Sequence, residues 1–321
     1  MSSLKTTRAH AAVIGSFVGD AACMGMHWVY DTSKLEDLLK TSCKTETPEF
    51  FSPPSCPFYT YTQGEQSPWG AEALELIRYV GKTTDFDGRV YSAFSFKSIN
   101  AYTGRLNGCF KTFRDNYVNG NEWDTCADPA DTQAHSMVKV PTLVARYYSL
   151  EDEAFVVKMM SYFTVHQGNP MAPEFGVASS LILKRIVLGD GIPDAVKWTL
   201  ASSHVADHVK EALTKVELKV QESPRPSLTA VAAEWGQHCG NPAVFMVSIY
   251  CILTSSNYTD AIRTNIRAGG DNCSRAHMIG ACMAASTSDD TNSIPQEWKT
   301  MTNDFDEITK SLIKIIENAA L

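Results

Sequence analysis

Apolar residues recur at intervals of three and four along most of the chain, which is the spacing of one buried face of an α-helix. Segment 11–25 consists mainly of small apolar residues and predicts a tightly buried helix. No alternating run of β-branched residues has a convincing strand length, so few strands are expected. Further helices are predicted over 33–40, 71–80, 89–102, 136–148, 152–166, 173–188, 193–202, 205–218, 227–235, 243–255, 258–268, 274–285 and 304–319.

Three segments interrupt the helical pattern. Residues 41–69 carry prolines at 48, 53, 54 and 57 among aromatic and polar residues, which predicts a long ordered loop. Residues 103–133 are rich in Asn, Gly and Asp and predict a second loop, and 287–295 is polar and predicted to be mobile. Neither an internal repeat nor a linker is evident. The pattern therefore predicts an all-α fold, a single compact multi-helix domain over 1–321, with disorder expected only at 1–6.

The composition excludes several classes of partner. The formal net charge is −8 and the pI is about 5.5, and no basic tract is available to bind nucleic acid or an anionic membrane. No apolar stretch reaches the roughly 18 residues of a membrane span. Hydrophobic residues make up 44% of the 321 positions, enough for a sizeable core. The acidic balance favours solubility at high concentration, where self-association is the partner interaction that this composition allows.

The nine cysteines are scattered and form no Cys-x-x-Cys pair, so a structural zinc site is not expected. Several lie in apolar helical contexts and are predicted to be small buried hydrophobic residues. This usage fits a reducing cytosol, and we predict a cytoplasmic location. His204 and His208 are the one histidine pair with helical i, i+4 spacing, and we expect them to be solvated surface residues.

The octet Gly-Gly-Asp-Asn-Cys-Ser-Arg-Ala at 269–276 is the most informative stretch of the chain. Two glycines allow a tight turn, and Asp271 can then cap the helix predicted to begin at Ser274. A carboxylate held on such a turn is a common way to present a hard oxygen ligand to a divalent cation. The octet therefore predicts either a helix cap alone or a cap that also binds metal.

A second distinctive stretch is Gly-Asp-Ala at 19–21, followed by His-Trp-Val-Tyr-Asp at 27–31. Asp20 is predicted either to border a ligand cleft or to satisfy buried backbone donors, which is the commoner role of a lone buried carboxylate. His27 either lines a pocket or packs in the core.

Two further segments carry polar residues next to predicted helices. Thr-Gln-Gly-Glu-Gln-Ser at 62–67 precedes a helix and supplies one carboxylate, Glu65; an ordinary polar loop is the alternative. The segment 131–141 contains small residues such as Ser136, and His166 follows a later helix, where the helix dipole alone would favour a histidine.

These segments, in this order, resemble the ADP-ribosylglycohydrolase family, whose Gly-Asp-Ala, Thr-Asp-Asp-Thr and Gly-Gly-Asp-Thr-Asp-Thr motifs the chain matches in part. The His-Trp-x-Tyr-Asp and Gly-Gly-Asp-Asn-Cys-Ser-Arg versions are similar to the J1-crystallin branch. The resemblance implies a multi-helix fold and a magnesium pair that helps to cleave the glycosidic bond of ADP-ribose. It implies a ligand cleft at Asp20, His27, Ser136 and His166 and metal ligands at Asp271, Glu65 and Ser274; in active members a glutamate stands at the place of His27 or Asp31.

The departures from the family pattern shape the functional hypothesis. Cys273 replaces the second aspartate of the family motif, and a soft sulfur does not suit Mg²⁺. Two candidate carboxylates stand where the pattern has four, so we expect no resident cofactor beyond a weakly held single Mg²⁺. The resemblance thus implies a refractive eye-lens protein with an eroded metal site and no catalysis. The alternatives are a residual or altered ADP-ribosyl hydrolase and a non-catalytic binder of ADP-ribose-like ligands.

Overall fold

The computed structural model describes residues 4–287 and 293–319, and within them it contains helices and isolated β-bridges but no β-strand. The all-α prediction is confirmed. In chain order the elements are α1 Leu4–Met24, α2 Thr32–Thr41, α3 Pro68–Val80, α4 Gly88–Ala101, α5 Gly108–Val118, η1 Trp123–Thr125, α6 His135–Tyr147, α7 Asp152–Phe163, α8 Met171–Leu188, α9 Ile192–Ala201, α10 Asp207–Val220, α11 Leu228–Trp235, α12 Ala243–Thr254, α13 Tyr258–Arg267, α14 Asn272–Ala285, α15 Gln296–Met301 and α16 Phe305–Ala319.

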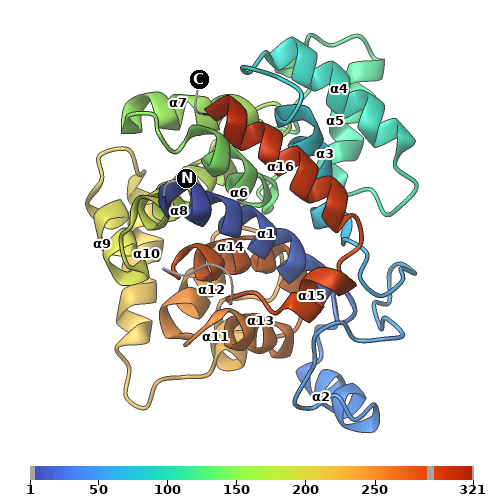
Figure 1. The fold of residues 1–321 in the computed structure, drawn as a ribbon, viewed down its shortest axis with the longest axis vertical. Helices are drawn as coiled ribbons and strands as arrows, with labels where there is room; N and C mark the ends of the chain where they lie inside the picture. The colour runs from blue at the N-terminus through green and yellow to red at the C-terminus, as the bar shows by residue number, and fades with distance from the viewer. Residues whose placement is uncertain (1–3, 288–292, 320–321) are drawn as a thin grey trace.

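Helices α1 and α14 lie against each other at the centre of the molecule (Figure 1). Gly15 and Gly280 meet there: a Cβ atom added to Gly15 would lie 2.4 Å from the Gly280 carbonyl oxygen, and one added to Gly280 would lie 2.3 Å from the Gly15 carbonyl oxygen. Any side chain would push the two backbones apart, so this approach requires glycine on both helices. The small apolar residues of α1 thus form the buried helix that the sequence predicts.

The remaining helices surround this pair. Helix α6 packs against α1, α3 and α8, while α12 and α13 pack against α14. In Figure 1, α3, α4 and α5 gather at one end of the molecule, and α16 crosses over α3 and α6. The buried apolar side chains form one hydrophobic cluster with contributions from α1 through α16. No described helix is both long enough and apolar enough to cross a bilayer.

The starts of the first two helices differ from the predictions. Helix α1 begins at Leu4, so the described part of segment 1–6 is helical; residues 1–3 lie outside the described residues. Helix α2 is capped by Asp31, whose carboxylate accepts hydrogen bonds from the Ser33 and Lys34 backbone N–H groups at 2.9 and 3.1 Å. The helix therefore begins one residue before the predicted range 33–40, because the cap is Asp31 rather than Ser33, the residue that the sequence favours as its cap.

Two helices, α5 and α15, are absent from the sequence prediction. Helix α5 falls inside 103–133, where Phe110 and Phe113 turn into the core and the Asn107 side chain accepts from the Phe110 N–H at 2.8 Å. Helix α15 begins just after the segment 287–295 that was predicted to be mobile; of that segment, 288–292 lie outside the described residues. Both helices have few apolar positions among many polar ones, so the spacing of their apolar residues does not indicate a helix.

Candidate functional site

The Gly-Gly turn before α14 brings two distant parts of the chain together. Gly269 and Gly270 have φ values of +69° and +62°, which a side chain would strain. The Trp28 N–H donates to the Gly270 carbonyl oxygen, and the Gly270 N–H donates to the Val29 carbonyl oxygen, both at 2.8 Å. This pair of hydrogen bonds places the stretch 27–31 beside the stretch 269–273.

Asp271 is fully buried at this turn and caps α14, as predicted. One carboxylate oxygen accepts a hydrogen bond from the Trp28 indole N–H at 2.6 Å, and the other accepts from the Ser274 backbone N–H at 3.4 Å. The Ser274 hydroxyl donates to the Asp271 carbonyl oxygen rather than to the carboxylate. The carboxylate of Asp271 is thus held by N–H donors of the protein itself.

His27 lies against this carboxylate as a neutral ring. Burial lowers the pKa of His27 below its ordinary value, and the charge of Asp271 only partly opposes this. Its Nε2 is 3.9 Å from an Asp271 oxygen, and its Nδ1 is 3.0 Å from the side-chain oxygen of Asn272. The ring packs on Trp28 with centroids 4.5 Å apart, so His27 both packs and faces the carboxylate.

Asp20, on α1, connects that helix to the start of α3. Its two carboxylate oxygens accept from the Ser67 N–H at 2.7 Å and from the Ser67 hydroxyl at 2.6 Å. Ser67 in turn caps α3, and His277 Nε2 lies 3.4 Å from Asp20. This is the arrangement expected of the structural alternative for Asp20, in which a buried carboxylate satisfies buried donors.

Glu65 and Cys273, from the other family-like metal positions, also have hydrogen-bond partners within the protein. The Glu65 carboxylate accepts from the Thr62 N–H of its own loop. The Cys273 thiol points to the Asp20 carbonyl oxygen at 3.6 Å, and burial raises the pKa of this thiol well above its usual range. Within the described residues, neither Asp271 nor Glu65 belongs to a cluster of three His, Cys, Asp or Glu ligand atoms.

We call Asp271 and its neighbours His27 and Ser274 the Asp271 corner. Aromatic side chains of the loop before α3 pack next to it, through Trp28. Phe58 and Tyr59 pack edge-on against Trp28, with ring centroids 5.5 Å away in each case, and Tyr59 packs on Tyr61 at 4.2 Å. The Arg105 guanidinium lies 5.1 Å from the Trp28 ring centroid and 5.2 Å from that of Phe58. We call Trp28, Phe58, Tyr59, Tyr61 and Arg105 the aromatic cover; it makes the predicted loop 41–69 an ordered part of the site.

Ser136 and His166, predicted to line the same cleft, bond to a different set of elements. Ser136 donates through its backbone N–H and its hydroxyl to the Gln167 side-chain oxygen. His166 Nε2 lies 2.7 Å from the Ser95 hydroxyl of α4, and its ring packs against Phe110 and Phe113 of α5. Burial lowers the pKa of His166 well below its ordinary value. The partners of Asp20 and Asp271 lie instead in the segment just after α1, at the N-cap of α3 and on α14.

A buried ionic network that the sequence did not predict joins α3 to α6. Glu72 accepts from His135 Nδ1 at 2.6 Å and from Lys139 Nζ at 2.5 Å. Burial alone would raise the pKa of Glu72, but the nearby His135 and Lys139 outweigh it and lower the pKa to about 2. The i, i+4 spacing of His135 and Lys139 on one helix was the signal available in the sequence.

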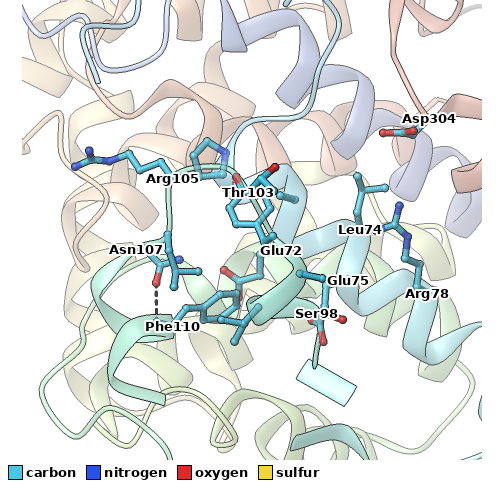
Figure 2. Close-up of a pocket in the computed structure, with 16 residues that line it drawn as sticks. Glu72, Leu74, Glu75, Arg78, Ser98, Thr103, Arg105, Asn107, Phe110 and Asp304 are labelled. Atoms are coloured by element: carbon cyan, nitrogen blue, oxygen red, sulfur yellow. Dashed lines mark hydrogen bonds between the residues drawn. The ribbon is translucent and has the colours of Figure 1, made fainter. Parts of the chain in front are cut away.

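A cavity of about 390 Å³ opens beside this network, lined by α3, α4, the start of α5 and the segment between α4 and α5. Figure 2 shows Glu72 and Glu75 of α3 and Phe110 of α5 turned toward it, with Arg105 at its edge. Burial raises the pKa of Glu75 to about 8. One Glu75 oxygen lies 3.4 Å from the Tyr91 hydroxyl that donates to it, and the other has no hydrogen-bond partner among the described residues.

Comparisons with known proteins show which family this fold belongs to. The family model for ADP-ribosylglycohydrolase matches residues 1–320. Crystallin J1A of Tripedalia cystophora is 25% identical over 317 residues, covering 94% of both chains, and crystallin J1B of the same organism is 24% identical over 324 residues, covering 96% of both. A solved structure of an ADP-ribosylglycohydrolase-related protein complex has the same fold, with a TM-score of 0.67 and 13% identity over 98% of this chain and 99% of that one. The chain belongs to the ADP-ribosylglycohydrolase family.

Proposed function

We propose that this chain is a structural protein, a refractive crystallin of the eye lens, that uses the family fold without its hydrolytic chemistry. The likeness to crystallins J1A and J1B over almost the whole chain supports this role. A refractive protein needs a stable, soluble fold at high concentration, and the net charge of −8 favours that solubility. The proposal includes a cytoplasmic location and self-association at high concentration, with no nucleic-acid or membrane partner.

The single observation that carries this proposal is the bond between the Trp28 indole and the Asp271 carboxylate at 2.6 Å. A magnesium pair needs several anionic oxygens free to coordinate, since each ion takes six oxygen ligands in a near-octahedral arrangement. Here one oxygen of Asp271 accepts the indole N–H and the other faces the Ser274 N–H. Because both oxygens of Asp271 are engaged, these two N–H donors compete directly with a cation for this carboxylate.

The neighbouring donors also fit a magnesium pair poorly. Cys273 offers a neutral thiol, because burial keeps its pKa high, and sulfur is a poor ligand for Mg²⁺. Both carboxylate oxygens of Asp20 accept hydrogen bonds from Ser67, and the Glu65 carboxylate accepts one within its own loop. These residues do not provide the donor set for two magnesium ions. A single weakly held Mg²⁺ at Asp271, with Glu65 and Ser274, would first require the indole bond to break.

The test is a turnover assay of the full chain in Mg²⁺ with a peptide carrying ADP-ribose on a side chain, beside an active member of the family. We expect no ADP-ribose release above the uncatalysed rate. Calorimetric titrations with Mg²⁺ and with ADP-ribose accompany the assay, and we expect no heat of binding from either. Metal-dependent release that the Asp271→Asn variant abolishes would overturn the proposal.

The cavity beside α3 supports the binder alternative. Its volume of about 390 Å³ lies in the range of small-molecule pockets. Arg105 at its edge could meet a phosphate, whereas Glu72 and Glu75 deeper inside favour an uncharged or amino group. Calorimetric binding of ADP-ribose without turnover, lost in the Arg105→Ala variant, would favour this alternative over the purely structural role.

A further inference from the structure

Three side chains with metal-binding atoms converge next to Glu72, and none of them belongs to the metal-like segments around Asp271 and Glu65. They are Cys109 near the start of α5, Asp131 in the segment before α6, and His135, the first residue of α6. Their ligand atoms all lie within 4.8 Å of one another, and all three residues are buried. We call them the Cys-Asp-His cluster.

The ring of His135 is oriented so that its free nitrogen faces the cluster. Its Nδ1 lies 2.6 Å from a Glu72 oxygen, which accepts but cannot donate, so Nδ1 carries the hydrogen. The lone pair of Nε2 is then directed away from Glu72. Nε2 lies 3.9 Å from an Asp131 oxygen and has no hydrogen-bond partner among the described residues. A carboxylate that fixes the tautomer of a histidine in this way is the usual second-shell arrangement of metal-binding histidines.

The other two members are also held in place. One Asp131 oxygen accepts from the Gln167 side-chain amide at 2.6 Å and from the Gln133 N–H at 3.1 Å. The Cys109 sulfur lies 3.2 Å from the His166 carbonyl oxygen, to which it donates. Nε2 of His135 and the Asp131 carboxylate therefore face each other at 3.9 Å without a hydrogen bond, beside the Cys109 sulfur. A divalent cation is a species that nitrogen, oxygen and sulfur atoms can bind together.

We propose that the Cys-Asp-His cluster binds one divalent cation of the zinc class. Sulfur, imidazole nitrogen and carboxylate oxygen are the ligands that Zn²⁺ takes in proteins, at about 2.0–2.3 Å, whereas Mg²⁺ and Ca²⁺ prefer oxygen alone. Ligand atoms around one zinc ion lie about 3.3–3.8 Å apart in a tetrahedral arrangement. The present separations, all within 4.8 Å, exceed that spacing by no more than about 1.5 Å, which the three side chains would have to close on binding.

The charges of the cluster also balance with a divalent ion. A thiol binds a metal ion as the thiolate, so Cys109 would lose its proton on binding. On binding, that proton leaves to solvent, and the Cys109 thiolate and the Asp131 carboxylate together neutralise the two positive charges. Glu72 and Lys139 already form a neutral pair at 2.5 Å beside the cluster.

This site is independent of the proposed function. It uses none of the residues of the Asp271 corner, and it requires no hydrolysis. It also differs from the prediction made from cysteine spacing, because its ligands come from three segments and include one cysteine. Asp131 and His135 are four positions apart, the same spacing as His204 and His208.

The test is a titration of the full, reduced, metal-free chain with Co²⁺ and Zn²⁺. We expect one Co²⁺ per chain, a thiolate-to-cobalt absorption band in the near ultraviolet, its loss on adding Zn²⁺, and a rise in Tm with Zn²⁺. Cys109→Ser and Asp131→Asn should each weaken Zn²⁺ binding at least as much as removal of a second-shell partner does, about 10- to 100-fold. Cys282→Ala, a buried cysteine far along the chain whose sulfur faces Met278, is the matched control and should change neither Kd nor the band.

Circular dichroism establishes that each variant is folded, and Glu72→Gln provides a second test that keeps all three ligands. It should weaken binding about 10- to 100-fold while the cobalt band persists at saturation. Three outcomes would overturn the proposal: no binding of either ion at submillimolar concentration, a cobalt complex without a thiolate band, or unchanged binding in both Cys109→Ser and Asp131→Asn. Loss of binding in Cys239→Ser alone would place the ion at that partly exposed cysteine and would overturn it equally.

Discussion

At the scale of single residues, Trp28 determines which donor the Asp271 carboxylate binds. Its indole N–H donates to a fully buried carboxylate at 2.6 Å. Its ring packs against Phe58, Tyr59 and Arg105 of the aromatic cover. Its φ of 60° lies in the left-handed region, which a bulky residue seldom adopts. Strain of this kind persists only where the surroundings stabilise it, and the bond to Asp271 is such a stabilising contact.

Replacement of Trp28 by Phe should therefore lower stability more than loss of ring area alone would. The change leaves one oxygen of a buried carboxylate without its donor, which costs about 1–3 kcal/mol. The measurement is the free energy of unfolding in urea. Trp235→Phe is the matched control, because the Trp235 indole also donates to a carboxylate, that of Glu234 at 3.1 Å, but at an exposed site. We expect the control to change stability by less than about 0.5 kcal/mol, and equal losses in both variants would contradict this role of Trp28.

Glu75 predicts a pH dependence of stability. Its pKa is raised from 4.5 to about 8 by burial, so between these values the folded protein holds a proton that the unfolded chain has released. The free energy of unfolding should fall as the pH rises from about 4.5 to about 8, by up to about 4 kcal/mol. Glu75→Gln keeps the shape of the protonated acid and should lose this dependence.

Urea unfolding at pH 5 and pH 8 measures the difference between Glu75→Gln and the unmodified chain. The variant should match it at pH 5 and exceed it at pH 8. Glu211→Gln, on the exposed side of α10, controls for the loss of one negative charge and should shift neither value. Parallel losses in all three proteins between the two pH values would exclude Glu75 as the cause.

Some residue-scale chemistry could be predicted from the sequence and some could not. The cap by Asp271 is local, because two glycines and a helix start lie within a few residues, and that prediction is confirmed. The partner of the Asp271 carboxylate, Trp28, is 243 residues away in the chain, and no local pattern gives such a pairing. The Glu72–His135 bond joins positions 63 residues apart for the same reason.

At the scale of helices, the contact between α1 and α14 depends on Gly15 and Gly280. A Cβ atom on Gly280 would lie 2.3 Å from a backbone carbonyl oxygen, which cannot move aside without shifting the helix. Gly280→Ala should lower the free energy of unfolding by about 1–3 kcal/mol or more, the usual effect of overpacking.

Gly108→Ala is the control for this substitution. A Cβ atom at Gly108, the first residue of α5, would meet no atom within 4 Å. Because alanine restricts the unfolded chain, this variant should be neutral or more stable by about 0.4–1 kcal/mol. Urea unfolding of both variants tests the pair, and a Gly280→Ala protein as stable as the unmodified one would show that the two helices can separate without cost.

The helices that the sequence predicts best are those with an apolar stripe. The core helices over 173–188 and 243–255 match α8 and α12 closely, because nearly every residue on their inner faces is apolar. Helix α5 was missed because its inner face is marked by only Cys109, Phe110 and Phe113. A helix of that kind is stabilised by the core it covers, and its own sequence carries little of the signal.

At the scale of the whole molecule, the net charge of −8 predicts repulsion between copies in dilute salt. Small-angle X-ray scattering at high concentration should show a depressed forward intensity in about 0.01 M salt. The depression should vanish near 1 M salt, where the screening length falls to about 3 Å. Attraction at low salt would contradict the solubility argument for a refractive protein, whereas attraction that appears only at high salt would indicate self-association of the kind we propose.

The central position of α1 has a consequence for how the chain is made. Its packing partner, α14, begins at Asn272, so a ribosome must finish most of the polypeptide before the earliest helix can bury its inner face. Contacts so distant along the chain slow folding, since long loops must close before they form. During synthesis α1 therefore exposes the apolar face that later meets α14 until that helix has been made.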